Sequence, residues 1–139
     1  MISLTSFAAA KQATQIKQGI AGRVYLQRGN YMPVPGRKPN YGKPVARTIW
    51  VYALTKRDQA TADGNFFSNI KTPLIAKAKS DTLGNYSMAL PPGSYSVFVE
   101  DRAKLYANSF DDNDNISPVE VKKGSLTQRD IVISSRAVY

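Results

Sequence analysis

Residues 80–99 read SDTLGNYSMALPPGSYSVFV, and this stretch decides the fold class. It holds two short runs in which every second side chain is apolar or aromatic, separated by the bend Pro91-Pro92-Gly93. The alternating residues are Tyr86, Met88 and Leu90, followed by Tyr95, Val97 and Val99. A period of two is typical of a β-strand with one buried face. Because the bend is short, we expect the two runs to pair as a hairpin.

The rest of the chain repeats this pattern of short apolar runs, which are rich in Val, Ile and Tyr and broken by Gly, Pro and Asn. The further runs are residues 19–27, 47–55, 74–80, 118–122 and 127–134. No long amphipathic segment offers the crossover helix that a parallel sheet needs. We therefore predict an all-β fold, a seven-stranded antiparallel Greek-key β-sandwich with long loops.

The length of 139 residues suits one domain, which we place at residues 19–139 after an N-terminal arm or short helix at 1–18. The arm runs from an apolar stretch, residues 2–7, into Ala8-Ala9-Ala10. This order resembles the tail of an export signal with a small-residue cleavage site, although the charged start is missing. The arm is therefore either a remnant of an export signal or an ordinary arm. No apolar stretch of about 18 residues is present, so we expect no transmembrane segment.

Residues 80–99 also resemble the signature of carboxypeptidase regulatory-like domains, a transthyretin-like, or prealbumin-like, family. The resemblance lies in Asp81-x-x-Gly84-x-Tyr86 and in the bend from Pro91 to Tyr95. Residues 19–24 and 42–45 are similar to the opening strand and the second turn of that family. The resemblance implies an immunoglobulin-like β-sandwich with a structural signature, and says little about function. Two loops, at 28–43 and 59–73, are longer than the family usually carries, and a particular function would reside there.

The composition excludes several kinds of chemistry. There is no Cys, which excludes disulfides and thiolate metal sites. There is no His, so neither a Ser-His-Asp triad nor a Cys-His pair can form. The related transthyretin-like hydrolases use His and Arg, so the resemblance does not imply their activity here. We expect no enzymatic activity.

The net charge of +9 is unevenly distributed. Residues 1–80 hold 13 Lys and Arg against 2 acids, whereas residues 81–139 hold 6 against 8. One interpretation is a solvated surface that happens to be basic. The other is a basic face that meets an anionic surface, such as a lipid headgroup or an acidic glycan. Nucleic acid is not expected, because the basic residues are scattered and no nucleic-acid-binding motif is present.

Trp50, Tyr52 and Phe98 form the first candidate ligand site. All three are expected on central strands, on the face opposite the main core. An open face would make them an aromatic platform for sugar rings or for a protein partner. Alternatively, the loops at 28–43 and 56–72 cover them as a second small core.

Tyr31, Tyr41 and Tyr106 form a second candidate, because they are expected in loops near several basic residues. Aromatic and Arg side chains are favoured at interface centres, so these loops are a candidate recognition tip. The alternative is ordinary loop packing.

The acidic run at 111–115 is the candidate metal site. Asp111, Asp112 and Asp114 alternate with or adjoin Asn residues, and clustered oxygen ligands suit Ca²⁺. The run lacks the Gly and the distal Glu of a helix-loop-helix calcium site. The alternative is a solvated loop whose Asp and Asn side chains cap turns.

The function expected from these observations is that of a non-enzymatic accessory, spacer or protein-binding domain of an exported bacterial protein. Such a protein would be periplasmic, outer-membrane-associated or secreted, with a protein or cell-surface glycan as its partner. The alternative is a carbohydrate-binding module that uses the aromatic face of Trp50, Tyr52 and Phe98.

Overall fold

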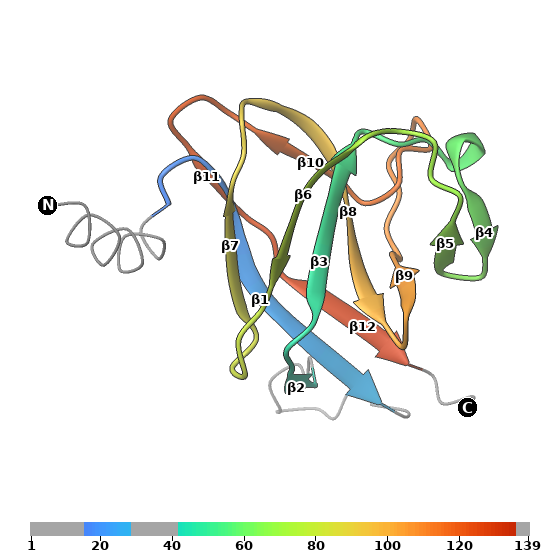
Figure 1. The fold of residues 1–139 in the computed structure, drawn as a ribbon, viewed down its shortest axis with the longest axis horizontal. Helices are drawn as coiled ribbons and strands as arrows, with labels where there is room; N and C mark the ends of the chain where they lie inside the picture. The colour runs from blue at the N-terminus through green and yellow to red at the C-terminus, as the bar shows by residue number, and fades with distance from the viewer. Residues whose placement is uncertain (1–15, 29–41, 136–139) are drawn as a thin grey trace, which may run out of the picture.

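A computed structural model describes residues 16–28 and 42–135 (Figure 1). The fold is all-β, with 58% of the described residues in strands arranged as two sheets, as a β-sandwich requires. The described ranges contain twelve strands, where the sequence predicted seven, because several predicted loops carry short two- or three-residue strands. Their only helical element is the 3₁₀ turn Arg57–Gln59. The predicted arm or helix and its export-signal remnant lie almost wholly outside the described residues.

The first sheet is built around the long strand β1 (Gly19–Arg28). Its first half lies between β7 (Asn85–Ala89) and β11 (Leu126–Gln128). Its second half lies between β2 (Lys43–Pro44) and β12 (Ile131–Ser135). β7 and β2 therefore lie along one edge of β1, and β11 and β12 lie along the other.

The second sheet has the order β4-β5-β9-β8-β3-β6, and β10 pairs with the first half of β8. Its strands are β3 (Thr48–Ala53), β4 (Thr61–Asp63), β5 (Phe66–Ser68), β6 (Leu74–Lys79), β8 (Gly93–Asp101), β9 (Lys104–Tyr106) and β10 (Pro118–Val121). β8 is its central strand, and β6 pairs only with β3 in the described part of the chain. β6 is therefore an edge strand.

The pairing of β1 corrects the expectation of a wholly antiparallel sandwich. β1 runs parallel to both β11 and β12, whereas the other strand pairs are antiparallel. The sequence argument considered crossovers between successive strands, which need a helix. Here the parallel partners are the first strand, β1, and the last two, β11 and β12. All the strands between them in the sequence form the connection, so no crossover helix is needed.

The expected hairpin at Pro91-Pro92-Gly93 is also wrong. β7 pairs with β1 in the first sheet, whereas β8 pairs with β3, β9 and β10 in the second. The bend therefore carries the chain from one sheet to the facing sheet. Strands on opposite sides of one core show the same inward alternation as two strands of a hairpin, so alternation alone cannot separate the two arrangements.

The main core lies between the two sheets and contains the alternating residues that the sequence singled out. Its buried side chains include Ile20, Val24, Ile49, Val51, Tyr86, Met88, Leu90, Tyr95, Val97, Val99, Val121 and Ile133. Tyr86 and Tyr95 are each only 6% exposed, and both hydroxyls donate to backbone carbonyls. The acceptors are the carbonyls of Arg129 and Pro91. A buried tyrosine needs such a partner for its hydroxyl, and both tyrosines have one.

No helix in the described ranges is long and apolar enough to cross a membrane.

Tyr86 makes the free energy of unfolding depend on pH in the alkaline range. Burial raises the pKa of Tyr86 well above its ordinary value, and the nearby Arg129 opposes this only in part. The folded chain therefore keeps the phenol proton at a pH where the unfolded chain has lost it. We expect the free energy of unfolding to hold below about pH 10, the unfolded pKa, and to fall as the pH rises above it.

The Tyr86→Phe variant tests this expectation by urea unfolding between pH 8 and 11. At pH 8 the variant should lose about 1 kcal/mol, because the hydroxyl bond is gone. Its stability should then fall less steeply above pH 10 than that of the unmodified chain, since one titrating phenol has been removed. Parallel pH profiles for the two proteins would contradict the assignment.

Candidate functional site

Phe98 lies in a second, smaller core and not on the surface, which corrects its proposed place in an aromatic platform. It is completely buried on the outer face of β8. The insertion after β3 folds over it, since β5 brings Phe67 to 5.7 Å between ring centroids. The other buried members of this core are Ala107 and Ile116. The alternative interpretation from the sequence, that the 56–72 loop covers this face, therefore holds for Phe98.

Trp50 and Tyr52 lie beside this covered region and stay half-buried. Their ring centroids are 6.5 Å apart, and the ring planes differ by 10°. The Trp50 indole N–H donates to Glu100 Oε1 at 3.0 Å. The Lys77 ammonium lies 4.0 Å from the Trp50 ring centroid, a cation–π contact. The tryptophan is therefore fixed by two charged neighbours and its ring already contacts a cation.

The edge strand β6 extends this aromatic pair across the sheet. Lys77 is opposite Trp50 in the register of β3 and β6, and Leu74 is opposite Tyr52. Leu74 and the adjacent Ile75 are 44% and 42% exposed. We call the set Trp50, Tyr52, Leu74, Lys77 and Glu100 the Trp50 surface. It combines exposed apolar area, an aromatic pair and both signs of charge at an open sheet edge.

Burial raises the pKa of the Tyr52 phenol. Its ring meets Phe98 edge to face, with centroids 5.5 Å apart. Tyr52 thus joins the Trp50 surface to the small core beneath it. Of the second candidate set from the sequence, Tyr31 and Tyr41 lie outside the described residues. Tyr106 is 3% exposed and packs in the main core at the end of β9, which corrects its expected place in a recognition loop.

The acidic run forms a turn held by Asp111. Its Oδ1 accepts from the backbone N–H groups of Asn113 and Asn115, each at 2.9 Å, and its Oδ2 accepts from Asn115 Nδ2 at 2.8 Å. These bonds, with the Asn115 side chain as the largest cause, hold the pKa of Asp111 below its ordinary value. Asp114 takes a left-handed backbone conformation, with φ of 64°.

The carboxylate of Asp111 is thus engaged by its own loop. Across residues 16–28 and 42–135 no three His, Cys, Asp or Glu side chains gather as a metal ion would need, and this includes Asp111, Asp112 and Asp114. Calcium binding at this loop stays a prediction from the sequence.

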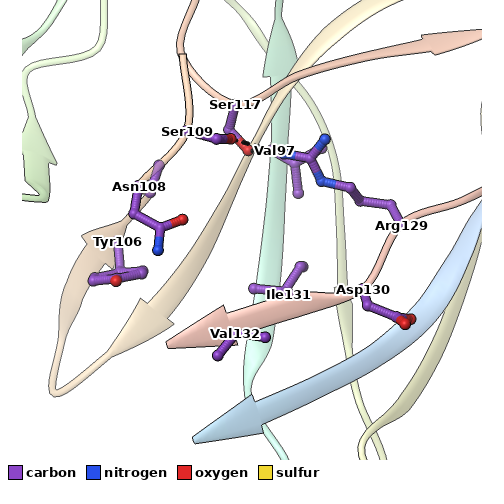
Figure 2. A pocket seen from close by; sticks show the side chains of 10 residues that line it. Val97, Tyr106, Asn108, Ser109, Ser117, Arg129, Asp130, Ile131 and Val132 are labelled. Carbon is purple, nitrogen blue, oxygen red and sulfur yellow. Dashed lines mark hydrogen bonds between the residues drawn. The ribbon is translucent and has the colours of Figure 1, made fainter. Parts of the chain in front are cut away.

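Arg129 is a candidate functional residue that sequence reasoning missed. It lies between β11 and β12 and lines a cavity of about 360 Å³ together with Ser109 and Ser117 (Figure 2). In the sequence it reads as an isolated basic residue within the last predicted run, residues 127–134. Its neighbours come from segments 10 to 20 residues away, so no local motif could have identified the cavity.

No family model matches the chain, and neither a curated protein nor a solved structure matches it.

Proposed function

We propose that the chain is a non-enzymatic accessory domain of an exported bacterial protein, and that the Trp50 surface binds a protein partner. Membership of the carboxypeptidase regulatory-like family is part of this proposal. The observation that carries it is the open edge of β6 beside the half-buried Trp50 and Tyr52. The Greek-key connectivity of the family belongs to the same proposal.

An edge strand exposes unpaired backbone N–H and C=O groups, which an extended segment of another chain can pair with. The edge strand β6 also carries Leu74 and Ile75, both exposed, which offer apolar contact area to such a segment. Lys77 and Lys79 are exposed on the same strand. These charges favour an extended partner segment that carries acidic side chains.

Two synthetic peptides test this proposal. One is an eight-residue peptide of alternating Val and Glu, and the other replaces each Glu with Lys. We expect the acidic peptide to shift the NMR signals of the β6 amides and of the Trp50 indole, and the basic peptide to leave them unchanged. Lys77→Glu should weaken the binding of the acidic peptide by about tenfold at low salt, because a close opposite charge becomes a like charge.

Lys122→Glu is the matched control, because Lys122 is an exposed lysine that follows β10, away from β6. It should leave the peptide affinity nearly unchanged. Peptide shifts confined to residues away from β6 and the Trp50 surface, or equal effects of the two substitutions, would contradict the proposal.

The second candidate function is carbohydrate binding. It is favoured by the near-parallel rings of Trp50 and Tyr52, since sugars stack on aromatic faces. Two observations weigh against it: Lys77 already lies over the Trp50 ring, and Phe98 is buried. A glycan array with the unmodified chain and with Trp50→Ala separates the two functions, because glycan signals lost in the variant would favour a carbohydrate ligand.

A further inference from the structure

The backbone of Arg129 is held firmly at the start of β12. Its N–H donates to the carbonyl of Ala21 at 2.8 Å, and its carbonyl accepts from the Tyr86 hydroxyl. The backbone at this point is therefore tied to both β1 and β7. This anchoring fixes the direction of the side chain, which extends toward β10 and the segment before it (Figure 2).

Among the described residues, the guanidinium of Arg129 donates only to neutral acceptors. Nη1 donates to the carbonyl of Pro118 at 3.1 Å, and Nη2 donates to Ser109 Oγ at 3.1 Å and to Ser117 Oγ at 2.6 Å. These bonds use three of the five N–H groups that a guanidinium carries. The other two have no hydrogen-bond partner within the described ranges.

No carboxylate balances this charge in the part of the chain that the structure describes. The ion pairs there join Arg47 and Arg102 to Asp101. The adjacent Asp130 accepts instead from the backbone N–H of Arg23 and from Gln128 Nε2, both at 3.0 Å. Figure 2 shows its carboxylate turned away from the guanidinium.

Burial lowers the pKa of Arg129, which records the cost of keeping its charge away from water. The guanidinium still stays protonated at neutral pH. A partly buried cation without an anionic partner raises the free energy of the folded chain. An anion in the cavity would relieve this cost.

The two serines add further donors to the same place. Each hydroxyl accepts from Arg129, so its own proton is directed elsewhere. No acceptor for either proton is found among residues 16–28 and 42–135. The two serine protons and the two unused guanidinium N–H groups therefore have no acceptor among the described residues, and a carboxylate, with two acceptor oxygens, would supply one.

The cavity beside these donors has a mixed wall, in which the polar residues Tyr106, Asn108 and Asp130 lie beside apolar side chains. Val97, Ala107, Ile131 and Val132 line it, and its volume is about 360 Å³. This is near the lower end for small-molecule sites. We propose that the cavity binds a carboxylate attached to a small apolar group, with Arg129, Ser109 and Ser117 on the carboxylate and the apolar part of the wall on the remainder. The inference concerns a different surface from the Trp50 surface, so either can fail without the other.

The carboxylate can belong to a free small acid or to the C-terminus of a peptide. NMR titrations of the unmodified chain at pH 7 and constant ionic strength distinguish the two sources. The first arm compares butanoate with butanamide, its neutral counterpart. The second compares acetyl-Ala-Ala-Val with a free C-terminus against the same peptide amidated. In at least one arm, we expect the ligand with a free carboxylate to shift the backbone N–H signals of residues 107–109, 117 and 129–132. Its neutral counterpart should leave these signals unchanged.

Variants assign the shifts to the guanidinium. Arg129→Met should weaken the binding of the carboxylate ligand at least tenfold, because the charged guanidinium is lost. Its melting midpoint without ligand should stay the same or rise, since a cation without a counterion is replaced by an apolar side chain of similar length. A purely structural Arg129 predicts the reverse, a lower midpoint. Arg57→Met, which removes an exposed arginine outside the cavity, should bind as the unmodified chain does.

Three results would overturn the inference. The first is the absence of shifts at these residues with both carboxylates up to 50 mM. The second is equal binding of inorganic phosphate and butanoate, which would indicate a site for any anion. The third is unchanged butanoate affinity in Ser117→Ala and in Arg129→Lys, which keeps the charge but loses the fork. The first two use the unmodified chain, so they decide the matter even if Arg129→Met does not fold.

Discussion

Replacing Phe98 with alanine should lower the free energy of unfolding by about 3–5 kcal/mol, the range for truncation of a buried phenylalanine. Phe98 is 0% exposed and meets Phe67 and Tyr52 at centroid distances of 5.7 and 5.5 Å. Truncation would leave a cavity in the small core, which packs the β4–β5 hairpin against β8 in addition to the pairing of β5 with β9. Chemical denaturation at pH 7 measures the loss.

Phe110→Ala is the matched control, because the same atoms are removed from a side chain that is 37% exposed. Phe110 contacts the small core at its margin, with its ring 6.2 Å from that of Phe67. Its truncation should cost about 1–2 kcal/mol, since less apolar area is buried. Equal losses for the two variants would mean that Phe98 does not organise this core.

The second large effect is expected at Gly22, in the middle of β1. A Cβ atom there would lie 2.1 Å from the carbonyl oxygen of Arg129 and 2.6 Å from its carbonyl carbon. Both atoms belong to backbone that β1 and Tyr86 hold in place, so they cannot move without loss of hydrogen bonds. Gly22→Ala should therefore cost about 3 kcal/mol, the upper part of the range for overpacking.

Gly64→Ala separates this steric cost from the cost of backbone conformation. Gly64 has φ of 63°, and a Cβ there would meet nothing within 4 Å. Its replacement should cost about 1 kcal/mol, from the left-handed conformation alone. A smaller loss at Gly22 than at Gly64 would show that the turn before β12 can shift. Such a shift would also move the Arg129 side chain, so Gly22→Ala should then weaken carboxylate binding even though its stability loss is small.

The sequence predicted the fold class and the inward faces of the central strands, because both follow from local alternation. Tyr86, Val97 and Val99 point into the core as their spacing indicated. Alternation also placed Phe98 on the opposite face, which is where it lies. It did not reveal which sheet each strand joins, and so the hairpin at Pro91-Pro92-Gly93 was mispredicted.

The candidate sites were harder to predict, because each depends on contacts between distant segments. Whether Phe98 is covered depends on the path of the 56–72 insertion, and that path depends on the pairing of β5 with β9. The environment of Arg129 depends on Ser109, Ser117 and Pro118 reaching its guanidinium from β10 and the segment before it. Neither arrangement leaves a periodic signal in the residues concerned.

The parallel alignment of β1 with β12 has a mechanical consequence. Residues 24–28 of β1 are in register with residues 131–135 of β12, and both strands run in the same direction. Tension applied at Gly19 and at Ser135, in opposite senses, therefore pulls the two strands lengthwise past each other. All the hydrogen bonds between them share this shear load together, whereas an antiparallel terminal pair would peel apart one bond at a time. A domain joined in series through these two strands should resist stretching, with a slow forced unfolding rate that single-molecule pulling can measure.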